Sequence, residues 1–339
     1  MNEQTNSPAA FKQLMKLRDA AIVHSALCAA AKLGVADLLA QGLSTPSELA
    51  RSLNVNEDAL YRTLRALATQ GIFEESDGRR FRNSELSDRL RTGVPGSVRP
   101  AFMFWGTEFY YRAFGDMFRS IQTGEASKPD GMNEWEYMAQ NPDVADIFDE
   151  AMTNFSTMQA PMLAGAYDFG KWESIMDVGG GNGILLSCIL KTYKNLRGVL
   201  ADRANVLERA SQRGFLEGEL ASRTTMQECD FFREVPSGCR AYVMKNVIHD
   251  WDDAKARDIL AHCRRAVPSN GVLLLVEWSL SEPNVPSIGK LSDLIMLVLT
   301  GGKERTVEEF RQLLSSAQFS LHGVTHTPTE LSIFEAFPV

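Results

Sequence analysis

The hydrophobic residues of this chain follow two different periods. Residues 11–40 carry apolar and small side chains at helical spacing. Beyond residue 174, short apolar runs alternate with amphipathic stretches, which indicates strands and helices in turn. The change predicts a helical N-terminal domain, a connector and an α/β domain, over residues 1–98, 99–165 and 166–339.

The N-terminal domain has the element order of a winged helix-turn-helix. Thr45 followed by Pro46 predicts a helix start, and residues 46–52 and 57–69 predict two helices around a turn. The runs IFEE and FRNS on either side of SDGRR predict a small β-hairpin. Such a unit serves either DNA binding or the packing of two copies.

Charge favours the packing of two copies. Arg62 and Arg65 lie on the second predicted helix, but basic and acidic residues nearly cancel over residues 1–98. The positive field that DNA phosphates attract is therefore missing. The small-residue segment VHSALCAAAKLGVADLL would allow two helices to approach closely. We expect a homodimer formed through this domain and no nucleic-acid partner.

The connector is rich in aromatic residues and methionine, as in AFMFWGTEFYYRAFGDMF and NEWEYM. It has helical spacing and is more apolar than a free linker. Two interpretations stay open, which are plain core packing and a helical wall around a flat, apolar ligand.

Five apolar runs define the α/β domain, and helical segments separate them: SIMDV, LRGVLAD, TTMQECD, AYVMKNVI and GVLLLVEW. This pattern is typical of a parallel sheet covered by helices on both faces, a Rossmann-like arrangement. The last two runs, SLHGVTHTP and LSIFEAF, predict a terminal antiparallel hairpin added to that sheet.

Composition narrows the class of protein. A net charge of −8 offers no basic surface for nucleic acid or an anionic membrane. The five cysteines contain no C-x-x-C pair, which favours reduced thiols over disulfides or zinc, and we expect no metal. The N-terminus is polar and lacks the apolar core of a secretory signal. The run LIMLVLT is too short to span a bilayer, so we expect a cytoplasmic protein with no membrane partner.

The first apolar run leads into a glycine-rich turn, Asp177-x-Gly179-x-Gly181-x-Gly183. Glycines permit a sharp turn and let a ligand lie against the backbone. A dinucleotide site usually reads G-x-G-x-x-G, and its last position is Ile184 here, so a pyrophosphate fits less well.

Acidic residues after the next strands narrow the choice of cofactor. Asp202 follows the second run, where a carboxylate can accept hydrogen bonds from both ribose hydroxyls. Asp230 follows the third run, and its neighbours Phe231 and Phe232 could sandwich a flat base. An acidic rim suits a cationic cofactor, so the set points to S-adenosylmethionine. An NAD-dependent oxidoreductase and a non-catalytic winged-helix regulator stay as alternatives.

The stretch VMKNVIHDWDD contains His249, which is either a buried structural ring or a group that moves a proton. His249 follows the fourth predicted strand. Asp177, Asp202, Asp230 and Glu277 end or follow the other strands. Because ligands bind at the carboxyl edge of a parallel sheet, this position favours proton transfer.

The strings DVGGGNG, CDFF, KNVIHDWDD, LLLVEWSL and DLIMLVLTGGKERT resemble those of class I methyltransferases that O-methylate small phenolic compounds. That family includes plant caffeic acid and flavonoid enzymes, acetylserotonin methyltransferase, and bacterial polyketide and phenazine enzymes. The resemblance covers nearly the whole chain. It implies a class I methyltransferase domain, an N-terminal dimerisation domain and S-adenosylmethionine as methyl donor.

The resemblance also implies roles for single residues. His249 matches the general base, and Glu277 and Glu304 match two acids that orient it. The residues expected to bind the cofactor are Asp177, Gly179, Gly181, Asp202, Asp230, Phe231, Lys245, Trp251 and Ser156. The residues expected to contact the acceptor are Met152, Phe155, Asn246, Asp250 and Met296. Asn246 stands where many plant relatives carry Trp, and Phe155 where some carry His, so plant substrate preferences do not transfer.

The expected function is therefore O-methylation of a phenolic hydroxyl on a small, multi-ring aromatic compound of secondary metabolism, such as an antibiotic. The alternative within the same fold is methylation of a ring nitrogen or a carboxylate on an aromatic heterocycle such as a phenazine. Such acceptors need less help from a base, so the His249 constellation favours oxygen.

Overall fold

The computed structural model describes residues 7–339, and the chain divides into two compact units. The first unit comprises residues 1–111 and 141–154, and the second comprises residues 112–140 and 155–339. The expected connector, residues 99–165, is thus distributed over both units. The first six residues of the polar N-terminus lie outside the described part of the chain.

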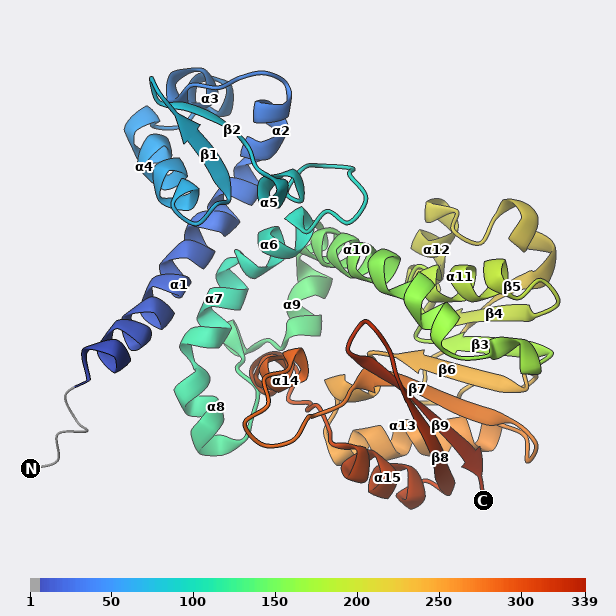
Figure 1. Ribbon diagram of the computed structural model, residues 1–339. Helices are drawn as coiled ribbons and strands as arrows, with labels where there is room; N and C mark the ends of the chain where they lie inside the picture. The colour runs from blue at the N-terminus through green and yellow to red at the C-terminus, as the bar shows by residue number, and fades with distance from the viewer. Residues whose placement is uncertain (1–6) are drawn as a thin grey trace, which may run out of the picture. The chain divides into compact units, whose positions relative to one another are not determined.

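The first unit contains the helix-turn-helix and hairpin that the sequence predicts (Figure 1). Its elements are α1 (Pro8–Leu33), α2 (Val35–Ala40), α3 (Pro46–Leu53), α4 (Glu57–Ala68), β1 (Phe73–Ser76), β2 (Arg80–Asn83), α5 (Glu85–Asp88) and α6 (Arg99–Trp105). Thr45 and Glu48 form a reciprocal cap at the start of α3, as its Thr-Pro sequence predicts. Strands β1 and β2 pair antiparallel from Phe73 opposite Asn83 to Ser76 opposite Arg80.

The N-terminal helix differs from the sequence prediction in two ways. Residues 11–40 do not form one helix, because Gly34 adopts a left-handed φ of 72° and ends α1 after Leu33. The small-residue face is also not a free surface. Cys28, Ala30 and Ala31 are buried in the core of their own unit, where α1 contacts α4 and α6. The prediction that these small residues meet a second copy was therefore wrong.

The second unit is built on a seven-stranded sheet with the order β5-β4-β3-β6-β7-β9-β8 (Figure 1). Its strands are β3 (Ser174–Val178), β4 (Arg197–Asp202), β5 (Thr224–Glu228), β6 (Ala241–Lys245), β7 (Val272–Trp278), β8 (Phe319–His326) and β9 (Leu331–Pro338). Strands β3 to β7 pair in parallel, whereas β9 runs antiparallel to β7 and β8. The predicted parallel sheet with a terminal antiparallel pair is confirmed.

The helices around this sheet fill the gaps between strands in the chain. They are α8 (Met117–Thr123), η2 (Pro129–Gly131), α9 (Glu134–Gln140), η3 (Phe169–Lys171), α11 (Ile184–Thr192), α12 (Ala204–Arg213), η4 (Gly218–Arg223), η5 (Ile248–Asp250), α13 (Asp253–Ala266), α14 (Ile288–Leu299) and α15 (Val307–Ser316). Two further helices, α7 (Glu108–Gly115) and α10 (Pro142–Ala166), contribute residues to both units.

Both faces of the sheet are buried, which explains why its strands read as continuous apolar runs. On one face, Tyr242 and Met244 of β6 pack in a core with α13 and α15. On the other face, Ala241 and Val243 pack in a core with α11 and the C-terminal part of α10. Alternation along a single strand thus feeds two separate cores and fixes the sheet between two helical layers.

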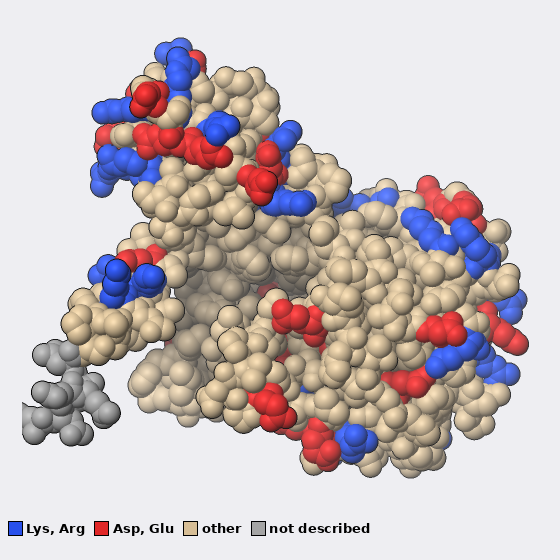
Figure 2. Space-filling view, in the orientation of Figure 1, with Lys and Arg blue, Asp and Glu red and all other residues tan. Residues whose placement is uncertain are grey.

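The surface fits the expected partners. No helix within residues 7–339 is long and apolar enough to cross a membrane. On the face shown in Figure 2, Lys and Arg lie interspersed with Asp and Glu over the N-terminal elements. Arg62 of α4 lies 3.9 Å from Asp58, one helical turn away, so its charge is partly balanced. This arrangement does not favour DNA binding by the helix-turn-helix.

Candidate active site

The carboxyl edge of the parallel strands gathers the predicted acidic residues and His249. Asp177 is the penultimate residue of β3, and Asp202 ends β4. Asp230 follows β5, His249 lies in the single turn η5 after β6, and Glu277 is the penultimate residue of β7. Because these five strands are neighbours in the sheet, one edge carries all five side chains.

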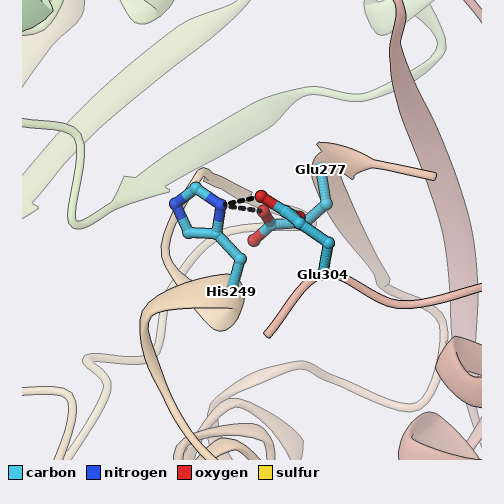
Figure 3. Close-up of side chains that lie close together, drawn as sticks. All are labelled: His249, Glu277 and Glu304. Atoms are coloured by element: carbon cyan, nitrogen blue, oxygen red, sulfur yellow. Dashed lines mark hydrogen bonds and ion pairs between the residues drawn. The ribbon is translucent and has the colours of Figure 1, made fainter. Parts of the chain in front are cut away.

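Two glutamates flank one side of the His249 ring (Figure 3). The Nδ1 atom of His249 lies 2.8 Å from Oε1 of Glu304 and 3.8 Å from Oε2 of Glu277. The Nε2 atom points away from both glutamates and lies 3.6 Å from Oδ1 of Asp250. The structure therefore brings the three predicted catalytic residues together and leaves Nε2 as the nitrogen that can face an acceptor.

Separate contacts hold each glutamate in place. Oε1 of Glu277 accepts hydrogen bonds from the backbone N–H groups of Val247 and Ile248, at 3.1 and 2.8 Å. Oε1 of Glu304 also accepts a hydrogen bond from the Ser292 hydroxyl, at 2.7 Å. The second oxygens of both carboxyls are buried and receive no hydrogen bond from residues 7–339. Each acid is thus anchored by one oxygen and presents the other to the buried cluster.

This arrangement shifts the acid–base properties of the cluster. Burial lowers the pKa of His249, but the charges of Glu277 and Asp250 and the hydrogen bond with Glu304 outweigh it and raise the pKa to about 10. Burial also raises the pKa of Glu277 to about 7 and that of Asp250 to about 6, against the opposing effect of the His249 charge. The imidazolium is therefore the main form of His249 at neutral pH.

Arg305 is a structural residue of the site whose role the sequence did not predict. Its side chain is fully buried and donates hydrogen bonds to the carbonyls of Ile248 and Trp251, at 3.3 and 2.9 Å. It also pairs with Asp253 at 2.9 Å. Arg305 thereby ties the turn that carries His249 to the loop that carries Glu304. The string GGKERT drew attention to this loop, but nothing local indicated that its arginine turns inward.

The glycine-rich turn lies beside Asp202. Gly179 and Gly181 adopt left-handed φ values of 70° and 57°, which glycine tolerates without strain. Oδ2 of Asp202 accepts a hydrogen bond from the backbone N–H of Gly181 at 2.9 Å. A Cβ atom built on Gly179 would lie 3.5 Å from the Phe231 ring, whereas one built on Gly181 meets nothing within 4 Å. The turn thus places Phe231 near a stretch of uncovered backbone, which suits a bound ligand.

A buried lysine lies between the glycine turn and the histidine cluster. The Nζ atom of Lys245 is 3.4 Å from the hydroxyl of Ser156. Burial lowers the pKa of Lys245 to about 8, although Asp177 and Glu277 favour its charged form. Burial and the charge of Asp202 raise the pKa of Asp177 to about 7, and its Oδ2 is buried without a hydrogen-bond donor among residues 7–339. These groups could hold the carboxylate and ammonium of an amino acid.

The aromatic residues after β5 do not form the predicted sandwich. The rings of Phe231 and Phe232 contact each other at a centroid distance of 5.1 Å, which leaves no space for a base between them. Phe232 instead packs edge-on against Trp251 at 4.7 Å and is 39% exposed. Asp230 accepts a hydrogen bond from the N–H of Phe232 at 3.1 Å and is thus partly engaged in its own turn. Adjacent rings in one tight turn face each other, and the sequence did not reveal that.

Comparison with known proteins agrees with this geometry. A family model described as the O-methyltransferase domain matches residues 111–320, and one described as the O-methyltransferase dimerisation domain matches residues 15–93. The chain belongs to the O-methyltransferase family. The phenazine O-methyltransferase PhzM of Lysobacter antibioticus is 39% identical over 319 residues, which cover 94% of this chain and 93% of that protein. The O-demethylpuromycin-O-methyltransferase of Streptomyces alboniger is 34% identical and covers 91% and 84%.

Solved structures confirm the fold of this O-methyltransferase. The crystal structure of LaPhzM matches with a TM-score of 0.92 and 38% identity, over 98% of this chain and 100% of that chain. The O-methyltransferase NcsB1 of neocarzinostatin biosynthesis, solved with S-adenosylmethionine and a hydroxy-methyl naphthoic acid, matches with a TM-score of 0.80 and 31% identity, over 93% and 96%.

The residues expected to contact the acceptor are divided between the two units of the methyltransferase. Phe155, Asn246, Asp250 and Met296 belong to the unit that carries His249. Met152, one turn before Phe155 on α10, belongs to the other unit and is 38% exposed. Asn246 has a left-handed φ of 53°, and its buried Oδ1 receives no hydrogen bond within residues 7–339. These acceptor contacts remain predictions.

Proposed function

We propose that this protein transfers a methyl group from S-adenosylmethionine to a phenolic hydroxyl of a small, multi-ring aromatic compound of secondary metabolism. The observation that carries the proposal is the buried His249 ring, with Glu277 and Glu304 on one nitrogen and the other nitrogen turned away from them. Oxygen acceptors need this arrangement more than amines do, because a phenol must lose its proton to become a good nucleophile.

The carboxylates make His249 a base strong enough for a phenol. A free imidazole has a pKa near ~6.5 and a phenol near ~10, so proton transfer between them in water is uphill by about 5 kcal/mol. With the pKa of His249 raised to about 10, the transfer becomes nearly balanced. The phenolic proton moves to Nε2 of His249, while Glu304 holds the Nδ1–H and stabilises the imidazolium.

The residues at the glycine turn fit S-adenosylmethionine. Asp202 lies where it can accept hydrogen bonds from ribose hydroxyls, Gly179 and Gly181 present bare backbone, and Phe231 lies beside them. Lys245, Ser156 and Asp177 are suited to the charged methionine end, and Asp230 and Trp251 complete the set. When bound, the cofactor supplies a methyl group on a cationic sulfur, which an oxygen nucleophile can displace.

The named relatives support an aromatic acceptor. They include a phenazine O-methyltransferase and a 2,7-dihydroxy-5-methyl-1-naphthoate 7-O-methyltransferase, 39% and 32% identical to this chain. Methylation of nitrogen is the second candidate, because an 8-amino-8-demethylriboflavin N,N-dimethyltransferase is 32% identical over 95% of this chain. The glutamate-flanked His249 favours oxygen of the two.

The proposal assigns a proton, and no metal ion, to the histidine cluster. Ligand atoms of His249, Glu277 and Glu304 lie within 4.8 Å of one another, so an ion is geometrically conceivable there. The 2.8 Å between Nδ1 and Glu304 is an ordinary hydrogen-bond length, however, and a bound ion would have to displace that proton. Methylation should therefore proceed unchanged after treatment with EDTA, and a loss that zinc or magnesium restores would contradict the assignment.

We also propose a homodimer formed through the first unit. Phe11, Leu14 and Leu17 lie at helical spacing on α1 and are 67%, 61% and 68% exposed, an apolar stripe that a partner chain would cover. The dimerisation family model begins within this helix, at residue 15. Sedimentation should show a dimer for the wild-type protein and a monomer for Leu14→Asp with Leu17→Asp. A wild-type monomer at micromolar concentration would overturn this part.

The direct test is incubation with S-adenosylmethionine and a panel of phenols, naphthols, hydroxyphenazines and matched aromatic amines. A mass gain of one methyl group, located on oxygen by NMR, is the expected result. Methylation of the amines alone would replace the proposal by its nitrogen alternative. No methylation of any member, with normal binding of S-adenosylhomocysteine, would leave the binding site without the proposed chemistry.

A further inference from the structure

Glu134 is an almost fully buried carboxyl group that the proposed mechanism does not use. It is the first residue of α9 and is only 4% exposed. Among residues 7–339, no side chain or backbone group donates a hydrogen bond to its carboxyl group and no cation pairs with it. Burial and repulsion by Asp250 raise the pKa of Glu134 to about 8, so the two carboxyls act on each other electrostatically.

Asp250 connects Glu134 to the reactive side of the base. Its Oδ1 lies 3.6 Å from Nε2 of His249, the nitrogen that the flanking glutamates leave free. Like Glu134, Asp250 receives no hydrogen bond to its side chain within the described chain; its one close charged neighbour is His249. The two carboxyls therefore lie on the side of His249 where the acceptor hydroxyl must come.

Buried acceptor groups without donors are costly, and folded proteins normally satisfy them with a partner. The residues near this side of the base add a further acceptor, because the buried Oδ1 of Asn246 also lacks a donor within residues 7–339. A ligand that supplies N–H or O–H groups would satisfy them, whereas an ether oxygen would add repulsion. The site therefore asks for a donor next to the hydroxyl that reacts.

We propose that Glu134 is a specificity-determining residue, which acts with Asp250 to select aromatic acceptors that carry an amino group beside the methylated hydroxyl. A primary aromatic amine offers two N–H donors, one for each carboxyl. A second hydroxyl offers one donor, and a methoxy group offers none. The order of preference among otherwise identical acceptors is thus amino, then hydroxyl, then methoxy. This inference rests on the proposed function and specifies its substrate class.

Three two-ring probes test the inference: 2-naphthol, 3-amino-2-naphthol and 3-methoxy-2-naphthol. For the wild-type enzyme, kcat/KM for O-methylation should be at least tenfold higher with the amino than with the methoxy compound, as a hydrogen bond to a charged group predicts. Glu134→Leu should reduce this ratio to about one and Glu134→Gln to an intermediate value, since glutamine keeps one acceptor oxygen but loses the charge. The change should fall mainly on KM.

Controls separate the inference from the proposed function and from misfolding. Glu136 lies two residues away on α9 and is exposed, so Glu136→Gln should keep the wild-type ratio. Calorimetric titration of each variant with S-adenosylhomocysteine checks that the unit is folded. Methylation of 2-naphthol tests the proposed function by itself, and only the amino-to-methoxy ratio tests Glu134. A wild-type ratio below twofold, or a ratio that neither substitution at Glu134 changes, would overturn the inference.

Discussion

The cofactor end of the site is built from backbone, and the base end is built from side chains. At the cofactor end, Asp202 accepts hydrogen bonds from the N–H groups of Gly181 and Arg203, at 2.9 and 2.7 Å. At the base end, His249, Glu277 and Glu304 come from three separate segments and meet through their ionisable groups. The first arrangement is fixed by local chain geometry, whereas the second depends on long-range packing and on a balance of buried charges.

This difference predicts where substitutions act. Changes at the cofactor end should weaken binding and leave the chemical step largely intact, because the groups there do not exchange protons. Changes at the base end should alter the rate and its pH dependence, because every member of the cluster sets the pKa of His249.

The largest effect is expected from His249→Ala. Loss of the base should lower kcat by about 10³-fold, within the range usual for general acid–base groups. The affinity for S-adenosylhomocysteine, measured by calorimetry, should stay within about twofold, because no cofactor contact is removed. His322→Ala on the exposed part of β8 is the matched control and should keep full activity. A His249→Ala enzyme within tenfold of the wild-type rate would show that the base lies elsewhere.

The pH dependence of the wild-type enzyme should be the next largest effect. Below a pKa of about 10 the imidazolium predominates and cannot accept a proton, so activity falls as the pH falls. The value of kcat/KM should therefore rise about tenfold per pH unit, or about a hundredfold from pH 7 to 9. Binding of S-adenosylhomocysteine over the same range serves as the control. A flat profile with a slow chemical step would contradict the imidazolium resting state.

Glu304→Gln should lower kcat by about ten- to a hundredfold, because a hydrogen bond to a charged group is replaced by a neutral one. The pKa of His249 should fall at the same time, so the rise in kcat/KM should end at a lower pH than in the wild-type enzyme. The KM of the acceptor should change by less than about threefold. Glu308→Gln, an exposed glutamate on α15, is the control. A change confined to KM would argue that Glu304 binds the acceptor rather than orienting the base.

The smallest of these effects belongs to the cofactor end. Asp202→Ala should raise the Kd of S-adenosylmethionine by about tenfold through loss of charged hydrogen bonds to the ribose. The kcat at saturating cofactor should stay within about threefold of the wild-type value. Asp258→Ala, on the exposed side of α13, controls for the loss of one surface charge. A large loss of kcat at saturation would mean that the two ends of the site are coupled.

The same contrast explains what the sequence could predict. The glycine turn and Asp202 were predictable because their residues are close in the chain and follow apolar strands. The position of His249 was predictable from its place after β6, since parallel strands share one carboxyl edge. The role of Glu304 came from a resemblance and not from spacing, because no local pattern places a loop residue beside a distant histidine.

Three features escaped the sequence for one physical reason. Arg305 and Glu134 are charged residues that local patterns assign to the surface, and only tertiary packing shows that they are buried. The break of the first helix at Gly34 was also missed, because apolar spacing continues on both sides of it. Burial of a charge is decided by partners far away in the chain, and a single sequence carries little information about those partners.

Gly302 bears on any attempt to redesign this enzyme. A Cβ atom built at this position would lie 2.0 Å from the carbonyl oxygen of His249 and 2.4 Å from the carbonyl carbon of Asp250. The loop and the turn that carries the base therefore touch backbone to backbone, and no side chain lies between them to absorb a change. Mutagenesis libraries that seek new acceptors can vary Asn246 and Glu134 freely, but diversity at residue 302 would produce almost only inactive clones.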